Sequence, residues 1–396
     1  MDENLFSQIV LESETKKTEA KTYLHKRYIY NDVKATPPSY FVGISGLRGI
    51  GKTVLLLQLA NETENSIYFS ADASYLRNEE LYNLIKYAKT KGYRNIFIDE
   101  IYYKENWQQD IKTAYDAGGA RIFFSGSSAI EIKKGADLSR RAIIFALKPL
   151  SFREYLSIKK GFGQLESILP KDLFVLEKRK KCLMETAKFK DYFSEYCQKG
   201  GLFYQSDDTA YFYKALESTL ERIVKNDLGH LRAIDTRIEN AVYQILERIA
   251  VSPAGEANYS NMANDVSVSK PTVIRIVDDL VKIGLVRRVL PCGKSFVRKE
   301  PKLYLAFPFR EFLNSMFARK SDIGALREEF FANHAENICY LKGRRGEKTP
   351  DFLFESKTLE IGGENKNFGQ NPDFIVKEGI SLEEKAIPLY LTGFLY

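Results

Sequence analysis

The chain has 396 residues, of which 44% are hydrophobic and 28% are charged. This balance excludes a mostly disordered protein, and the length predicts two or three domains. Its 59 Lys and Arg residues exceed its 52 Asp and Glu residues, for a net charge of +7, which permits contact with nucleic acid without requiring it.

The cysteines and the N-terminal residues indicate in which cellular compartment the protein is expected. The cysteines stand far apart in sequence, so we expect no metal knuckle, redox pair or disulfide framework; they are Cys182, Cys197, Cys292 and Cys339. The acidic, amphipathic N-terminus is unlike a secretory signal, and no apolar run approaches the roughly 18 residues that span a bilayer. We therefore expect a soluble, reduced, cytoplasmic protein.

Short apolar runs alternate with helix-length segments in the first third of the chain. Residues 1–33 predict a charged helical arm. Strands are predicted at 40–44, 66–69, 95–98 and 121–124, with the apolar face of a helix at 54–59. Strands that alternate with helices predict a parallel sheet covered on both faces.

A glycine-rich segment lies between the first strand and its helix. It matches the pattern G-x-x-x-x-G-K-[ST] and comprises Gly46, Leu47, Arg48, Gly49, Ile50, Gly51, Lys52 and Thr53. Glycines let successive N–H groups point at one anion, and the helix that continues through Val54 adds its positive end. We predict that residues 46–54 bind nucleotide phosphates, with Lys52 at the β- and γ-phosphates and the Thr53 hydroxyl on Mg²⁺.

Polar residues follow the next strands. Asp99 and Glu100 directly follow the apolar run 96–98. We predict that Asp99 holds Mg²⁺ through its water shell and that Glu100 orients and polarises the attacking water. After the following strand Ser125, or as second choice Ser127, would bond the γ-phosphate or the water; a helix cap is the alternative role.

Paired arginines come next, Arg140 and Arg141 in the segment DLSRR. Arginines near a nucleotide stabilise developing phosphate charge, either from the same chain or from a neighbouring subunit. A salt bridge to Asp137 or to a neighbouring helix is the open alternative.

Several segments together carry a resemblance to a known family: GLRGIGKT, IFIDEI, Trp107 in the helix after it, FFSGSSA, DLSRR and PLSFREYL at 149–156. Over nearly its whole length the chain resembles the prokaryotic ATPases of the AAA superfamily, in particular the archaeal and bacterial branch with a C-terminal domain of unknown function. The resemblance implies ATP rather than GTP, and a helical lid that PLSFREYL opens. It gives Lys52, Thr53, Asp99 and Glu100 the roles argued above.

A compact basic module is predicted further along. Segments 259–265 and 270–283 predict helix, turn and helix, with Ser269 as N-cap and Pro271 in the first turn. Helical spacing turns four residues of the second helix inward, namely Val273, Ile276, Val277 and Leu280, and leaves four outward, namely Thr272, Arg275, Asp279 and Lys282. Segments 285–290 and 295–298 predict a β-hairpin, so the module resembles the winged helix that the family carries here.

This module offers duplex DNA as a partner through its basic side chains, which are Arg275, Arg287, Arg288, Lys294, Arg298 and Lys299. Asp278 and Asp279 on the second helix would repel phosphate. Winged helices also dock onto proteins, so DNA binding and a docking or lid function both stay open.

The C-terminal segments PDFLF (350–354) and EIGG (360–363) resemble the core of restriction-endonuclease-like nucleases. That core needs two carboxylates, here Asp351 and Glu360, to hold a metal, and a lysine two residues on to activate water.

Glu328 or Glu329 would add a third acidic group to this C-terminal core. The lysine position holds Gly362, so Lys366 would have to reach in from the following segment. The departure favours a structural or DNA-docking remnant over an active nuclease.

The overall prediction is an α/β protein: a P-loop NTPase parallel sheet with a helical lid, a winged helix and a small nuclease-like α/β domain. The expected parts are an N-terminal arm, the ATPase core, the lid, the winged helix and the nuclease-like domain, at 1–33, 34–150, 151–235, 236–310 and 311–396. The function expected first is Mg²⁺-dependent ATP hydrolysis that moves the lid and winged helix on DNA. The alternatives are an ATP-dependent signalling or scaffold switch that acts on protein partners and an ATP-gated, metal-dependent nuclease. A second copy of the chain, in a homo-oligomer, is a possible partner.

Overall fold

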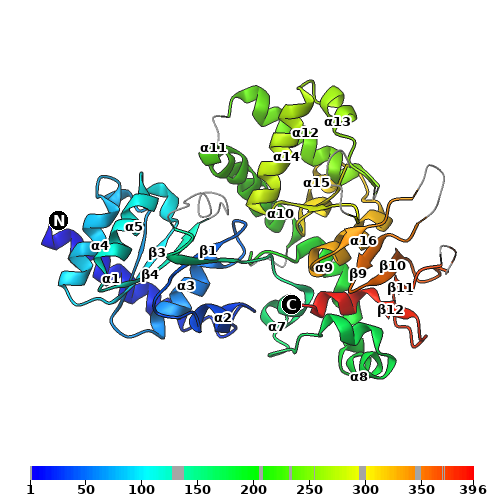
Figure 1. Cartoon of the computed structure of the whole chain (residues 1–396), viewed down its shortest axis with the longest axis horizontal. Coiled ribbons are helices and arrows are strands. Elements are labelled where there is room, and N and C mark those ends of the chain that lie inside the picture. Colours follow the sequence, from blue (N-terminus) through cyan, green and yellow to red (C-terminus); the bar gives the residue numbers. More distant parts are fainter. Residues whose placement is uncertain are drawn as a thin grey trace. The chain divides into compact units, whose positions relative to one another are not determined.

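The computed structural model describes residues 2–126, 138–204, 208–231, 234–253, 255–293, 300–343, 349–367, 369 and 371–396. The chain divides into two units, Met1–Lys148 and Pro149–Tyr396, called unit 1 and unit 2 below (Figure 1). Among the described residues, no helix combines the length and the apolar character that a membrane crossing needs. The finer division into five parts stays a prediction.

Unit 1 is built on a parallel sheet with the strand order β2-β3-β4-β1-β5. Its strands are β1 (Phe41–Ser45), β2 (Ser66–Ser70), β3 (Asn95–Asp99), β4 (Arg121–Gly126) and β5 (Ala142–Ala146). The apolar runs are buried on both faces because helices cover the sheet. The predicted α/β fold with a parallel sheet is confirmed.

Helices cover both faces of this sheet. They are α1 (Glu3–Ala20), α2 (Tyr30–Lys34), α3 (Lys52–Asn61), α4 (Leu81–Thr90) and α5 (Trp107–Ala117). The β1-to-β2 crossover runs along the sheet in the direction opposite to the next two, so right-handed connections place α3 on one face and α4 with α5 on the other, as Figure 1 shows. The N-terminal helix α1 packs on β2 and α3, with Phe6 and Ile9 in the common core. Helix α1 is therefore part of unit 1.

Unit 2 begins with helices and ends with a second sheet. The helices are α7 (Phe152–Lys159), α8 (Leu176–Thr186), α9 (Phe193–Lys199), α10 (Thr209–Arg222), α11 (Leu228–Leu231), α12 (Thr236–Val251), α13 (Tyr259–Asp265), α14 (Lys270–Ile283), α15 (Phe309–Met316) and α16 (Ile323–His334). The sheet has the order β12-β11-β10-β9-β8. Its strands are β8 (Cys339–Tyr340), β9 (Phe352–Phe354), β10 (Lys357–Gly362), β11 (Phe374–Lys377) and β12 (Ala386–Pro388).

The residues of the PLSFREYL segment (149–156) make structural contacts within unit 2. Ser151 and Glu154 form a reciprocal capping box at the start of α7. Phe152 is fully buried among aromatic rings from α9, α16 and the C-terminal turn, and its N–H donates to His334 Nε2 at 3.0 Å. Ser151 and Arg153 both donate to the Tyr396 carbonyl at 2.9 Å. The segment therefore ties the start of unit 2 to the end of the chain.

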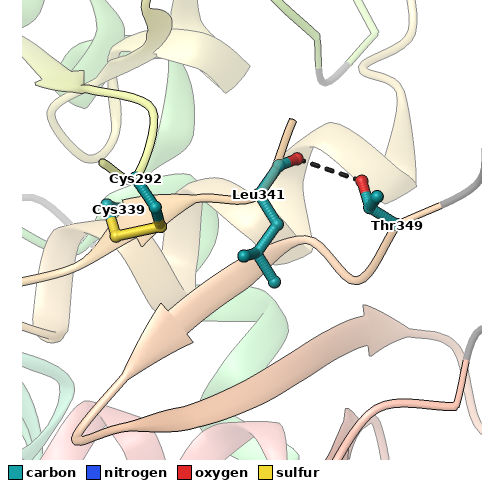
Figure 2. The surroundings of a disulfide bond; sticks show 4 residues. All are labelled: Cys292, Cys339, Leu341 and Thr349. Carbon is teal, nitrogen blue, oxygen red and sulfur yellow. Dashed lines mark hydrogen bonds between the residues drawn. A yellow bond between two sulfur atoms is a disulfide. The ribbon is translucent and has the colours of Figure 1, made fainter. Parts of the chain in front are cut away.

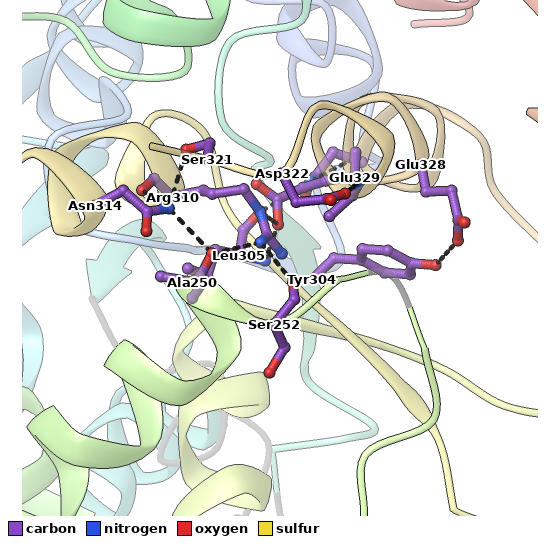
Figure 3. A network of polar contacts seen from close by, with 12 residues as sticks. Ala250, Ser252, Tyr304, Leu305, Arg310, Asn314, Ser321, Asp322, Glu328 and Glu329 are labelled. Atoms are coloured by element: carbon purple, nitrogen blue, oxygen red, sulfur yellow. Dashed lines mark hydrogen bonds and ion pairs between the residues drawn. The ribbon is translucent and has the colours of Figure 1, made fainter. Parts of the chain in front are cut away.

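A buried ion pair fixes the middle of unit 2 (Figure 3). Arg310 and Glu329 are 2% and 0% exposed, and Arg310 Nε lies 2.9 Å from Glu329 Oε2. The same carboxylate oxygen accepts from the Leu305 N–H at 2.8 Å, and Arg310 Nη1 donates to the Ala250 carbonyl at 2.6 Å. The pair joins α12, α15, α16 and β7, the strand before α15 (Lys302–Leu305). Glu329 therefore stabilises the packing of unit 2.

Two cysteines that we expected to be unpaired form a disulfide. Cys292 and Cys339, 47 residues apart, are bonded with a Cα–Cα distance of 5.0 Å. The backbone brings them together because the Cys292 N–H donates to the Tyr340 carbonyl and the Tyr340 N–H donates to the Leu290 carbonyl. Figure 2 shows the disulfide together with the hydrogen bond that Thr349 Oγ1 donates to the Leu341 carbonyl. The expectation that no two cysteines pair was wrong.

The predicted helix-turn-helix and its hairpin are present in part. Ser269 caps α14 and Pro271 lies in its first turn. The stripe of Val273, Ile276, Val277 and Leu280 is buried as expected. The strand β6 (Val286–Val289) pairs antiparallel with β7 (Lys302–Leu305), whereas the second strand had been expected at 295–298, which lies outside the described residues.

Candidate nucleotide-binding and hydrolysis site

The phosphate loop curls at three glycines with positive φ, Gly46 at 154°, Gly49 at 82° and Gly51 at 92°. A Cβ on Gly46 would lie 2.4 Å from the Leu147 carbonyl oxygen, so no side chain fits there. Gly51 is the N-cap residue of α3. The loop therefore places its N–H groups at the N-terminus of a ten-residue helix, the positive end, where a phosphate can bind.

Lys52 is 5% exposed and its ammonium donates to the loop's own carbonyls, at 2.9 Å to Gly46 and 3.1 Å to Leu47. A phosphate oxygen placed in the loop would compete for these donors. Thr53 is exposed in the first turn of α3, where its hydroxyl is available to a metal ion. Leu47 and Ile50 are buried beneath the loop, which gives them a packing role, and Val54 is half-buried.

Arg27 was not predicted and supports the loop from the N-terminal segment. It is 4% exposed and donates to the Ile50 carbonyl of the loop and, at 2.7 Å, to the Lys148 carbonyl. Nothing in the local sequence distinguishes it from the other basic residues there, because its partners are distant backbone atoms.

Asp99, at the end of β3, is held by groups from the two neighbouring strands and by the backbone of the next residue. Its Oδ2 accepts from the Tyr68 hydroxyl at 3.1 Å. Its Oδ1 accepts from the Ser125 hydroxyl and, at 3.1 Å, from the Glu100 N–H. Ser125 therefore lies beside Asp99 and orients that carboxylate, and its bond to the γ-phosphate or the attacking water stays a prediction. The second choice, Ser127, lies outside the described residues.

Glu100 follows in the left-handed region, with φ 48° and ψ 46°. Burial and the Asp99 charge raise the pKa of its carboxyl, whereas Lys52, Arg48 and a hydrogen bond from Tyr102 act to lower that pKa. Within the described residues, its buried Oε2 has no hydrogen-bond partner. A buried carboxylate oxygen without a protein donor suits a group that accepts from a water or a ligand.

The donor set fits Mg²⁺. This ion keeps several waters and binds through one or two protein oxygens plus substrate phosphates. The Thr53 hydroxyl and the Asp99 carboxylate would hold it. Among the described residues there is no cluster of three or more His, Cys, Asp or Glu side chains suited to a metal.

Arg140 and Arg141 do not lie at this site within one chain. They precede β5, which is parallel to β1 with Ala142 beside Phe41, whereas the phosphate loop follows Ser45 at the other end. Four residues of strand separate the two ends by about 13 Å. Arg141 instead pairs with Asp116 of α5 at 3.0 Å, and Arg140 is exposed. The same-chain role is thus wrong, and the ion pair to a neighbouring helix is found for Arg141.

Some of the predicted DNA-contacting residues are exposed, some are engaged within unit 2, and some lie outside the described residues. Arg275 is exposed on α14. Arg287 donates to the Ala335 carbonyl and burial lowers its pKa, so it points into unit 2; Arg288 pairs with Asp278. Asp279, predicted outward, is buried and lies 3.5 Å from Lys282. The remaining candidates, Lys294, Arg298 and Lys299, lie outside the described residues.

The nuclease-like carboxylates of unit 2 do come together. Burial and the neighbouring Glu328 and Glu360 raise the pKa of Asp351 to about 7. Lys302 Nζ lies 2.9 Å from Glu328 and 3.9 Å from Asp351.

The lysine position of this cluster is filled from elsewhere. A Cβ on Gly362 would meet the Lys366 side chain at 2.5 Å, and Lys366 Nζ lies 2.5 Å from Glu360. Lys366 therefore occupies the space of the missing side chain, as the sequence left open. Two ammonium groups among the three carboxylates neutralise much of the charge that a divalent metal needs.

The fold and the site define an AAA-type P-loop ATPase domain in unit 1, and a family model described as an AAA domain matches residues 39–156. A second model, a domain of unknown function (DUF8612), matches residues 190–306. The uncharacterized protein MJ1637 of Methanocaldococcus jannaschii is 30% identical over 364 residues, covering 84% of this chain and 76% of that protein. The chain belongs to the family of this archaeal protein.

Other similar proteins are more distant. An uncharacterized protein of Haemophilus influenzae is 24% identical over 85% of this chain and 82% of its own length. Among solved structures, a variant of RuvB from Thermotoga maritima has 15% identity and a TM-score of 0.29, covering 78% of this chain and 95% of that one. AMPPCP-bound DnaA from Aquifex aeolicus has 15% identity and a TM-score of 0.28, covering 66% and 90%.

Proposed function

We propose that unit 1 hydrolyses ATP in a Mg²⁺-dependent reaction at the loop edge of its sheet. The observation that carries the proposal is that the phosphate loop after β1 and the residues Asp99 and Glu100 at the carboxyl end of β3 lie at the same edge of the sheet, with β4 between the two strands. The carboxyl ends of parallel strands are where such sheets bind ligands.

Each residue has a distinct task in this reaction. Lys52 leaves the Gly46 and Leu47 carbonyls for the β- and γ-phosphates, and loop N–H groups bind the phosphate oxygens. Thr53 and Asp99 hold Mg²⁺, which when bound neutralises charge on the phosphates. Glu100 orients the attacking water through its carboxylate and takes up its proton.

Arg140 is the candidate that completes the site from a second copy of the chain. It is exposed at the edge where the strands begin, away from its own loop. In a head-to-tail homo-oligomer this edge would meet the loop edge of the neighbour, where a guanidinium stabilises developing phosphate charge. A turnover rate that rises with protein concentration in the wild type and not in Arg140→Ala would support this arrangement.

The nucleotide cycle would act on unit 2, and duplex DNA is the target favoured by one observation. Lys270 and Arg275 are exposed on the first half of α14, the part of such a helix that reads a major groove. We propose that α12 to β7 form a winged helix used in this way. The protein-directed switch is the second candidate, since Arg287 and Arg288 are engaged within unit 2.

ATP turnover with and without duplex DNA at two salt concentrations separates these targets. Stimulation that fades at high salt, and that Arg275→Ala reduces, indicates phosphate contact through α14. Turnover that DNA leaves unchanged indicates a protein partner. Arg248→Ala is the control, because it also removes one exposed positive charge, but from α12, where Arg248 pairs with Asp265.

A further inference from the structure

A buried arginine outside the loop pattern holds the backbone of the phosphate loop. Arg27 is 4% exposed, and its Nη1 donates to the Ile50 carbonyl inside the loop. Its Nη2 donates to the Lys148 carbonyl at 2.7 Å. Lys148 follows β5, the strand that pairs with β1, so this second bond anchors the guanidinium to the sheet that carries the loop. One cation therefore joins the loop to the chain segment beside it.

The bond to Ile50 fixes the orientation of one peptide group. In a trans peptide the carbonyl and the N–H of the next residue point in opposite directions. Because the Ile50 carbonyl points to Arg27, the Gly51 N–H points away from it, and among the described residues no backbone carbonyl accepts from this N–H. A cationic donor on the carbonyl also polarises the peptide, which makes its N–H a stronger donor. The Gly51 N–H is thus available to an anion in the loop.

Two contacts keep the segment of this arginine in place. On one side Gln58 of α3 is 5% exposed, and its Nε2 donates to the Tyr23 carbonyl at 2.8 Å and to the His25 carbonyl at 3.0 Å. On the other side the Tyr28 hydroxyl accepts from the Lys148 N–H at 3.3 Å. The guanidinium is therefore fixed before a nucleotide binds, so the loop needs no ordering at that moment.

We propose that Arg27 is a positioning residue of the phosphate loop, which holds the peptide between Ile50 and Gly51 so that the Gly51 N–H faces the diphosphate of a bound nucleotide. This inference rests on the proposed ATPase function. Backbone N–H groups of such a loop bind the α- and β-phosphates, which ATP and ADP share. Arg27 therefore strengthens the binding of both nucleotides and leaves the chemical step at Glu100 unaltered.

Arg27→Met tests the positioning role because it removes both donors and keeps a long, unbranched side chain. We expect the Kd for ATP and the Kd for ADP to rise equally, by roughly tenfold to a hundredfold, the effect of losing one hydrogen bond to a charged group. The KM for ATP should rise as well while kcat stays within about twofold, because the lost contact is made equally in the ground state and the transition state. A merely structural role would instead reduce the amount of active protein, and so lower kcat at an unchanged KM.

Arg121→Met is the matched control. Arg121 Nη2 also donates to a backbone carbonyl of unit 1, that of Thr36 at 2.6 Å, but it is the first residue of β4 and lies at the edge of the sheet opposite the loop. Its KM and both Kd values should equal those of the wild type. Fluorescence of the buried Trp107 in unit 1 reports whether each variant is folded.

Gln58→Leu is the second variant, and it decides where Arg27→Met does not fold. It loosens the segment that carries Arg27 and leaves the guanidinium in place. Because Gln58 Oε1 is buried without a hydrogen-bond partner in the described part of the chain, its removal offsets part of the lost stability. Both Kd values should rise about threefold, the effect of one neutral hydrogen bond.

Three results would overturn the positioning role while the ATPase function stands. They are an Arg27→Met variant with the KM and Kd values of Arg121→Met, a loss of affinity for ATP without one for ADP, and wild-type affinities in Gln58→Leu where Arg27→Met is unfolded. A wild type without turnover, indistinguishable from Lys52→Ala, would instead refute the proposed function itself.

Discussion

Truncation of Arg310 tests the energetics of unit 2 most sharply. In Arg310→Ala the Glu329 carboxylate, 0% exposed, keeps only the Leu305 N–H as a donor among the contacts described above, and the Ala250 carbonyl keeps the Asn314 amide (Figure 3). Leaving one member of a buried ion pair uncompensated costs about 3–5 kcal/mol of unfolding free energy. Arg319→Ala is the control, because Arg319 is 51% exposed and its 3.2 Å pair with Glu247 contributes at most about 1 kcal/mol.

Urea unfolding followed by two signals assigns this loss to a unit. The chain has one tryptophan, Trp107, so its fluorescence reports unit 1, whereas far-UV circular dichroism reports both units. With an m-value of about 3 kcal/mol per molar, the unit 2 transition of Arg310→Ala should move down by about 1–1.7 M, and the fluorescence transition should stay.

The pH dependence adds an internal check on Arg310→Ala. Burial raises the pKa of Glu329 in the wild type, and loss of Arg310 removes the charge that lowers it. Protonation then relieves the unpaired charge, so the gap between variant and wild type should narrow as the pH falls. If Arg310→Ala shifts the transition no more than Arg319→Ala does, the buried pair does not hold unit 2 together and the reasoning is refuted.

Three further predictions concern single positions. Gly46→Ala should weaken ATP binding at least tenfold in a fluorescent-nucleotide titration, because its Cβ would meet the Leu147 carbonyl at 2.4 Å; Gly92→Ala, also at positive φ but in open space, should bind normally. Cys292→Ser should lower the free energy of unfolding of unit 2 by at most about 4 kcal/mol, the loop-entropy value for a separation of 47 residues. A melt of the wild type in reductant should show the same loss; no loss in either experiment would show that the disulfide contributes nothing. Because the Asp351 pKa is raised to about 7, the folded state binds more protons than the unfolded state between about pH 4 and 7, so stability should fall as the pH rises through this range. In urea titrations, Asp351→Asn should flatten the dependence of the unfolding free energy on pH. An unchanged dependence would show that other groups set it.

Local patterns sufficed for the phosphate loop and its sheet. Lys52 and Thr53 are placed by the spacing of the glycines between a strand and a helix, without tertiary information. The position of Asp99 at the end of a strand follows from the apolar run before it and its own charge. The position of Ser125 beside Asp99 required the further assumption that its strand lies next to β3, which the strand order supports.

The errors share one cause, contacts set by topology. Arg140 and Arg141 are close to the site in sequence, but they precede a strand parallel to β1 and so lie at its opposite end. Arg287 and Arg288 are neighbours on a strand and must face opposite sides, so only one could have pointed outward. No sequence signal indicates that Cys292 would meet Cys339, or that Arg48 would meet Tyr102, because each pair is joined by non-local folding.

The central claim, that Glu100 orients water at a Mg²⁺-dependent ATPase site, is tested most directly by Glu100→Gln. The substitution keeps the side-chain shape and removes the proton acceptor. The measurement is phosphate release under saturating Mg-ATP, paired with ATP affinity from a fluorescent-nucleotide titration. We expect kcat to fall by a factor of about 10²–10⁴ with an unchanged Kd; a variant that turns over ATP at the wild-type rate would contradict the account.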